Sequence, residues 1–584
     1  MSASHQWVSV TIVAAVVVVA SCTPRLPASP AGSGLLGDQS RQARPADLEL
    51  SRLQRAGANY LKALVALGQG DYERARVEMA AAVSLDPGGV EPRLHLVQLQ
   101  IRAGDLGAAL RHGLVLKSLQ PDNADHSMLV AGLLVSLQRH DEAIAAYRRV
   151  LVLVPGNEES LVQLGSLYNR VGDYRQAIEI LEEASRLRPD SLIANFYLGR
   201  SYVLEGRHEE ALDAYRRALR INPSSDQIHL EMGLVYERQE HHDRAVQSYK
   251  KALELNPHSL VARRRLGGVY VTEGKLDDAI SEYENLAVLE EDPLDTQIKI
   301  GLVSLEKGDY ERAAMEFSMV IAAQPQDDDV RYYLAVTYDE LGDRVGAEQE
   351  FRGISPASDR YTDARIQLVE LLRSDGRSAQ AVAAVKELQA SRSQSREAHL
   401  LLISLYRERE EYGKAIVEAR ALIEMSPAED RHLFTLASLY DLAGERDKAI
   451  VLLRRVIEMN PENGTALNYL GYTFAERGEN LEEAEALIKR ALVLHPSDGF
   501  FLDSLGWVYF QRGNYEAAVA ELERAARLAG GDPIINEHLA DAYAKVGRVE
   551  EAIRAYRDCE ARTEDGKQRR RVTEKMKSLG RGPF

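Results

Sequence analysis

The chain has 584 residues, of which 45% are apolar and 28% charged, and a formal net charge of −17. This composition is that of a folded protein. The acidic balance argues against nucleic acid as a partner, because a duplex-binding surface carries a basic excess. The only two cysteines, Cys22 and Cys559, lie near opposite ends of the chain, so no disulfide framework is indicated.

The first element is a short apolar run at residues 8–20, VSVTIVAAVVVVA. It suits the core of a signal peptide and is too short to span a bilayer comfortably. The run ends in VASC, and small residues before a cysteine resemble the bacterial lipoprotein box. By that resemblance residues 1–21 are a signal peptide and Cys22 carries the lipid. The residues before the run contain no Lys or Arg, so an uncleaved apolar tail or a misplaced start codon remain the alternatives.

The same resemblance implies a location. Thr23 rather than Asp follows the cysteine, which resembles sorting to the outer membrane, so we expect a protein anchored in the bacterial cell envelope and facing the periplasm. Residues 22–45 are rich in Pro, Gly, Ser and Ala and predict a lipid-anchored flexible linker. A short helix is predicted at 46–55.

From Ala56 onward the sequence repeats every 34 residues. Position 8 of the unit is Gly or Ala in twelve units, position 11 is Tyr in nine and position 32 is Pro in ten. One residue is inserted near 477–487, so fifteen units cover residues 56–566. Position 20 is alanine in every unit: Ala75, Ala109, Ala143, Ala177, Ala211, Ala245, Ala279, Ala313, Ala347, Ala381, Ala415, Ala449, Ala484, Ala518 and Ala552.

Each unit predicts two amphipathic helices of about fourteen residues joined by a Gly-Asp-like turn. Small residues at positions 8 and 20 remove bulk where the paired helices meet, and larger ones such as Tyr202 and Tyr215 fill the space beside them. A glycine inside a helix costs roughly 1 kcal/mol of propensity, which closer packing offsets. Proline at position 32 ends the second helix.

This pattern resembles the tetratricopeptide repeat family, which implies an all-α fold, a right-handed α-solenoid of stacked helix pairs. Residues 567–584 are predicted to form a basic capping helix and tail. Gly353 and Pro356 interrupt an expected second helix, which predicts either a break near 353–360 or a shortened helix without motion.

The repeats leave little chain for a catalytic domain, and no hydrolase, metalloprotease or phosphate-loop motif occurs, so we expect no enzymatic activity, cofactor or metal. Cys559 occupies a small-residue core position and is interpreted as a packing residue.

In this family the first helix of each unit lines a concave face. By that resemblance one candidate partner-binding set is rich in aromatic and amide side chains, which suit an extended peptide or a sugar chain. The alternative is that its rings only pack between units. The set is Asn468, Tyr472, Asp503, Trp507, Phe510 and Gln511.

A second candidate set is a basic groove for an acidic peptide or an anionic polysaccharide, with a solvated charged face as the alternative. It consists of Arg170, Arg200, Arg238 and Arg264. Family members with lipid anchors serve polysaccharide export, pilus assembly or outer-membrane assembly. The resemblance therefore implies a scaffold that binds a protein or polymer, or else an accessory subunit that presents substrate to a separately encoded glycosyltransferase or protease.

Overall fold

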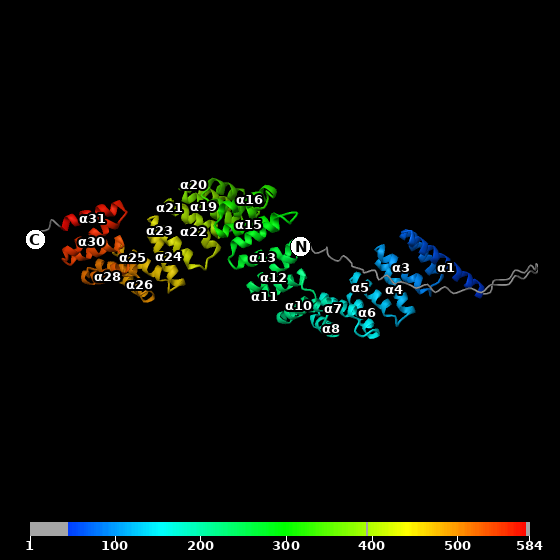
Figure 1. The fold of residues 1–584 in the computed structure, drawn as a ribbon. Helices are drawn as coiled ribbons and strands as arrows, with labels where there is room; N and C mark the ends of the chain where they lie inside the picture. The colour runs from blue at the N-terminus through cyan, green and yellow to red at the C-terminus, as the bar shows by residue number, and fades with distance from the viewer. Residues whose placement is uncertain (1–44, 393–394, 580–584) are drawn as a thin grey trace, which may run out of the picture. The chain divides into compact units, whose positions relative to one another are not determined.

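A computed structural model describes residues 45–392 and 395–579, which form 31 α-helices and no strand (Figure 1). The predicted all-α solenoid of helix pairs is confirmed. The predicted signal peptide (1–21), Cys22, the linker up to residue 44 and the last five residues of the predicted tail lie outside the described residues. Within those residues, no helix has the length and apolar character needed to cross a membrane.

The described chain forms two compact units, with the boundary between Pro223 and Ser224. The first unit contains α1 (Pro45–Gly68), α2 (Tyr72–Leu85), α3 (Val90–Arg102), α4 (Leu106–Leu119), α5 (Ala124–Ser136), α6 (His140–Leu153), α7 (Glu158–Val171), α8 (Tyr174–Leu187), α9 (Leu192–Glu205) and α10 (His208–Ile221).

The second unit contains α11 (Asp226–Arg238), α12 (His242–Leu255), α13 (Leu260–Thr272), α14 (Leu276–Ala287), α15 (Leu294–Lys307), α16 (Tyr310–Ala323), α17 (Asp328–Glu340), α18 (Arg344–Gly353), α19 (Tyr361–Ser374), α20 (Ser378–Ser391), α21 (Arg396–Glu408), α22 (Tyr412–Met425), α23 (Asp430–Leu442), α24 (Arg446–Met459), α25 (Gly464–Arg477), α26 (Leu481–Leu494), α27 (Gly499–Gln511), α28 (Tyr515–Leu528), α29 (Pro533–Lys545), α30 (Val549–Arg562) and α31 (Gly566–Leu579).

The turn between paired helices follows from its residues. Gly172 ends α7 in the left-handed conformation, with φ +84°, which glycine adopts without steric penalty. Asp173 then caps α8 by accepting a hydrogen bond from the backbone N–H of Gln176. The same Gly-Asp pair joins α15 to α16 at Gly308 and Asp309. The inserted residue of the long unit lies in this turn, where Asn480 also has a positive φ of +49°.

The repeated small residues form the helix–helix contacts. All fifteen alanines at position 20 are fully buried. A Cβ atom placed on Gly233 would lie 2.4 Å from the ring of Tyr249, and one on Gly165 would lie 2.4 Å from Leu181. At these two positions glycine leaves the space that the large side chain of the second helix occupies.

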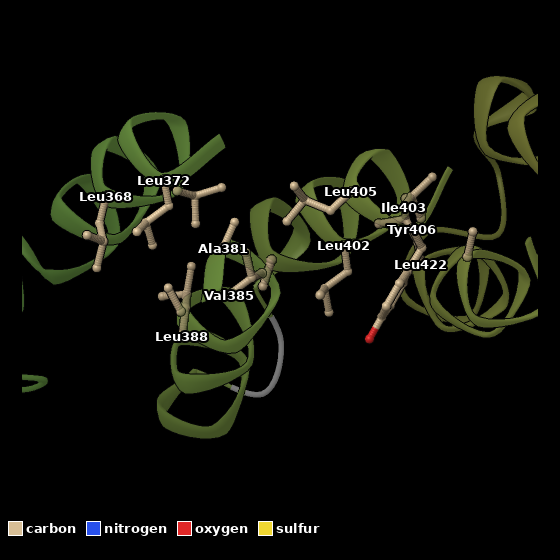
Figure 2. Close-up of a cluster of buried hydrophobic side chains, with 14 of the residues drawn as sticks. Leu368, Leu372, Ala381, Val385, Leu388, Leu402, Ile403, Leu405, Tyr406 and Leu422 are labelled. Atoms are coloured by element: carbon tan, nitrogen blue, oxygen red, sulfur yellow. The ribbon is translucent and has the colours of Figure 1, made fainter. Parts of the chain in front are cut away.

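The core continues from one pair to the next, as Figure 2 shows for α19 to α22. Ala381 and Val385 of α20 lie between Leu368 and Leu372 of α19 and Leu402 of α21. Each of these residues is fully buried. A single pair could not bury both sides of its second helix, so stability depends on the neighbouring pairs.

Three boundaries refine the sequence analysis. Residues 46–55 are the first part of α1, which continues to Gly68 without a break. Helix α18 has 10 residues and ends at Gly353, whereas α16 and α20 have 14. The capping helix is α31 and begins at Gly566.

The segment after α18 is held by several contacts. Ile354 is buried, Arg360 forms an ion pair with Asp329 at 2.7 Å, and Arg365 donates to the backbone oxygen of Phe351 at 2.7 Å. These contacts favour the shortened helix over a flexible joint, and the break near 353–360 stays a prediction.

Candidate binding site

The aromatic candidate residues lie on first helices of consecutive pairs. Tyr472 is on α25, and Asp503, Trp507 and Phe510 are on α27. Helix α27 contacts both α25 and α29. Residues one helical turn apart on α27 share a face of the helix, so Asp503, Trp507 and Phe510 point to the same side.

Trp507 is the centre of a stack of rings. Its indole lies parallel to the ring of Phe510, with centroids 4.7 Å apart and an interplanar angle of 6°. The indole also stacks with the imidazole of His538 from α29. Their ring centroids are 4.2 Å apart, and the angle between the ring planes is 17°. The ring of Tyr472 lies 6.5 Å from the same imidazole. Tyr472, Trp507, Phe510 and His538 are called the aromatic surface below.

A buried ion pair orients the imidazole. His538 Nδ1 lies 2.9 and 3.1 Å from the two carboxylate oxygens of Asp503, and both residues are less than a tenth exposed. Burial alone would lower the pKa of His538, but the negative charge of Asp503 and its hydrogen bond outweigh burial and raise that pKa. Asp541 and Glu537 add to the rise. A protonated imidazole facing an indole is also a favourable cation–π pair.

Tyr472 completes the surface on α25. Its hydroxyl donates to Glu476 at 3.3 Å, and burial, Glu476 and Asp503 together raise its pKa. Trp507, Phe510 and Tyr472 are each partly buried. Trp507 packs on the core below α25 and α26, and Phe510 on the core below α29 and α30. The rings therefore pack between repeats and also keep an accessible face.

The structure brings together four of the six predicted residues: Tyr472, Asp503, Trp507 and Phe510. Asn468 is partly buried, and its Oδ1 atom has no hydrogen-bond partner among the described residues. Gln511 is exposed at the end of α27. His538, which links these residues, was not predicted from the sequence. The signal was present as an acidic residue at 503 and a histidine one repeat later, but only side-chain geometry shows that the two meet.

The four predicted basic residues are all exposed. Arg264 forms an ion pair with Glu290 at 2.6 Å. In the described part of the chain, Arg170, Arg200 and Arg238 form no ion pair. Arg170 and Arg200 belong to the first compact unit, and Arg238 and Arg264 to the second. The grouping into one groove stays a prediction.

Cys559 is fully buried on α30, and burial raises the pKa of its thiol to about 11. A thiol in this setting is a poor nucleophile, which agrees with a packing role. In the part of the chain that the structure describes, no group of three His, Cys, Asp or Glu side chains is placed to hold a metal ion.

Consecutive helix pairs of one repeated length define the described chain as a helical repeat protein. The family models described as tetratricopeptide repeat agree. One model matches residues 162–226, 230–296, 366–430, 434–499 and 504–565, and a second matches 66–133 and 304–367. The chain belongs to the tetratricopeptide repeat family and is a protein-interaction scaffold. Family membership points to a non-enzymatic protein.

No curated protein matches the sequence. Among solved structures, MamA is 28% identical over 29% of this chain and 95% of its own, with a TM-score of 0.27. A tetratricopeptide repeat protein from Parabacteroides merdae ATCC 43184 is 17% identical over 43% of this chain and 99% of its own, with a TM-score of 0.34. YrrB, described as a TPR protein with an unusual peptide-binding site, is 20% identical over 32% of this chain and 95% of its own, with a TM-score of 0.28.

Proposed function

We propose that this chain is a lipid-anchored scaffold of the bacterial cell envelope, facing the periplasm from the outer membrane, that binds a protein or peptide on its aromatic surface. The observation that carries the binding proposal is the stack of Phe510, Trp507 and His538, in which Trp507 and Phe510 remain partly exposed. The proposal of a lipid anchor is supported only by the sequence around Cys22.

The stack suits a binding hot spot because its rings are already held in place. Asp503 fixes His538, and His538 and Phe510 both pack against Trp507. A partner side chain would therefore order few rotors on this surface, and aromatic rings provide large contact areas. Glu476, which accepts a hydrogen bond from the Tyr472 hydroxyl, offers a polar group to the backbone of an extended peptide.

The binding site can be tested with a displayed peptide library. Peptides captured by the wild-type protein are measured by fluorescence polarisation against Trp507→Ala and against Val493→Ala. Val493 is exposed on the second helix α26, outside the aromatic surface. Loss of a central ring should weaken binding by about 30-fold, the scale of a hot-spot residue, while Val493→Ala should bind as the wild type does. Equal affinities for all three proteins would reject the aromatic surface as the site.

The anchor has its own test. Radioactive palmitate is expected to label the wild-type protein in bacterial cells and to leave Cys22→Ala unlabelled. Two acyl chains hold a protein stably at a membrane, so the wild type should fractionate with the outer membrane. Label that persists in Cys22→Ala would show that another residue is acylated, and absence of label in both proteins would reject the anchor.

A further inference from the structure

The last repeat contains a cavity unrelated to the aromatic surface. It has a volume of about 510 Å³ and lies among α28, α29 and α30. This volume falls within the usual range for pockets that hold small molecules, roughly 300–1,000 Å³.

Three arginines line this cavity: Arg527 from α28, and Arg554 and Arg562 from α30. None of the three forms an ion pair within the described residues, although many exposed arginines of this chain do. The guanidinium of Arg562 lies over the backbone of Gly531, where even a Cβ atom would approach its Cζ atom to 2.8 Å. Glycine at 531, with φ +97°, thus leaves room for this guanidinium at the cavity wall.

Asn536 of α29 adds a polar group to the wall of the cavity. It lines the cavity and is 7% exposed, yet its amide makes no hydrogen bond within the described part of the chain. Its amide atoms are not among the fully buried polar atoms that lack a partner, so the amide reaches the solvent in the cavity and is accessible to a ligand.

The equivalent residue of an earlier repeat shows what is missing. Asn195, at the same position of its unit, donates to the backbone oxygen of Ser191 at 2.8 Å and accepts from Arg217 at 2.9 Å. In the last repeat Asp558 replaces that arginine, and a Gly530–Gly531 turn with two positive φ angles precedes the helix. Asn536 therefore keeps its hydrogen-bonding capacity for another group.

Three carboxylates also line the cavity, and their pairing determines the local charge. Glu523 and Glu551 are both bound by Arg548, at 3.1 and 2.5 Å. Asp558 lies one helical turn from both Arg554 and Arg562 and forms no ion pair within the described residues. When Arg548 is included, four arginines face three carboxylates, so the cavity has a net charge of one positive unit.

From this arrangement we propose that the cavity binds a small ligand through a carboxylate or phosphate group. The oxygens of the anion accept hydrogen bonds from the guanidinium groups of Arg527 and Arg562, which approach from different helices, and from the amide nitrogen of Asn536. Guanidinium groups match the geometry of such oxyanions. Asp558 opposes the ligand and limits its affinity.

Isothermal titration calorimetry of the full chain at low ionic strength tests the site with two probes, inorganic phosphate and citrate. We expect saturable binding of at least one probe with one site per chain, and the tighter probe identifies the anionic group. Arg562→Ala and Arg527→Ala should each weaken binding by about tenfold or more, the scale of a lost hydrogen bond between charged groups. Asp558→Asn should strengthen binding, because it removes a negative charge from the wall.

The matched control is Arg557→Ala, on α30 but outside the cavity. It should bind as the wild type does, and so should Trp507→Ala, since the aromatic surface is a separate site. Absence of saturable binding with both probes would overturn the proposal. Equal affinities for Arg562→Ala and Arg557→Ala would overturn it as well.

Discussion

At the scale of single residues, the repeat depends on the combined volume of two facing positions. Gly233 faces Tyr249, and Gly301 faces Phe317, whose ring would lie 2.6 Å from a Cβ atom placed on Gly301. The order of sizes is reversed in the sequence where Ile403 stands at position 8 and Ala419 at position 24. One small and one large side chain fill the contact in either order, as close packing requires.

The first prediction concerns the facing residues Gly233 and Tyr249. Gly233→Ile is expected to destabilise α11 and α12 by about 1–3 kcal/mol through overpacking against Tyr249. Adding Tyr249→Ala should restore part of the loss, because the double variant reproduces the native order of Ile403 and Ala419. Hydrogen exchange of the two helices measures the effect locally, which suits a repeat protein that need not unfold in one step.

Gly132→Ala is the control, because a Cβ atom there would meet nothing within 4 Å. It should leave exchange unchanged or slow it slightly, since alanine favours the helix. A similar increase in exchange at both glycines would show that facing volume is not the cause.

The second prediction follows from the raised pKa of His538. The folded state holds the imidazole proton more tightly than the unfolded state, so this stabilisation is fully present below about pH 6.5 and is lost as pH rises through the folded pKa. In a Trp7→Phe background Trp507 is the single tryptophan. A protonated imidazole quenches a stacked indole, so the fluorescence of Trp507 should increase in a transition centred above pH 6.5.

His538→Gln should abolish this transition, and His495→Gln, which does not contact Trp507, should preserve it. A transition centred below pH 6.5, or one that survives His538→Gln, would contradict the assigned ion pair with Asp503.

The sequence predicted most of this fold because the same contact recurs in every repeat. The small residues at positions 20 and 8 can be read from the sequence because they leave space for a neighbouring side chain, and any side chain of the right size can fill that space. His538 could not be predicted, because its role depends on two rotamers from different repeats, those of Asp503 and Trp507. The unbonded amide of Asn536 was likewise hidden, since Asn195 at the equivalent position is fully bonded.

At the scale of elements, α31 closes the array through charge as much as through apolar contact. Val572 and Gln568 are its buried residues. Glu537 of α29, which is 4% exposed, accepts from Arg571 and from Lys575 at 2.6 and 3.0 Å. Burial would raise the pKa of Glu537, but the hydrogen bonds from Arg571, Gln568 and Lys575 outweigh it and lower that pKa to about 2. This stabilisation is present above about pH 4.5 and is lost as pH falls toward 2.

The third prediction uses Cys559, which belongs to the same core as Val572. In a Cys22→Ser background, Cys559 should react slowly with Ellman's reagent at pH 8, because it is buried and its pKa is raised to about 11. Glu537→Gln weakens the docking of α31 and should speed the reaction by about tenfold, corresponding to a loss of roughly 1.4 kcal/mol in a charged hydrogen bond. Arg570→Ala, exposed on α31, should react at the wild-type rate. Equal rates in all three proteins would show that Glu537 does not hold the cap.

At the scale of the whole molecule, the cores are built locally. In the first unit, clusters of buried apolar residues extend from Ala63 to Ala177. In the second unit, such clusters extend from Ala313 to Val572. Repeat arrays gain stability chiefly from contacts between adjacent repeats, so each unit contains most of what its own folding requires.

The last prediction is that the two units fold separately. A fragment of residues 45–223 and a fragment of residues 224–584 should each be helical by circular dichroism, and their summed signal at 222 nm should match that of residues 45–584. The second fragment should also retain the pH-dependent fluorescence of Trp507, because Asp503, Trp507 and His538 all lie within it. A fragment ending inside α8, such as residues 45–180, is the control. It removes Leu181, whose side chain fills the space beside Gly165, and should lose helical signal beyond the residues deleted. A coil spectrum for either unit would show that the fold requires the whole array.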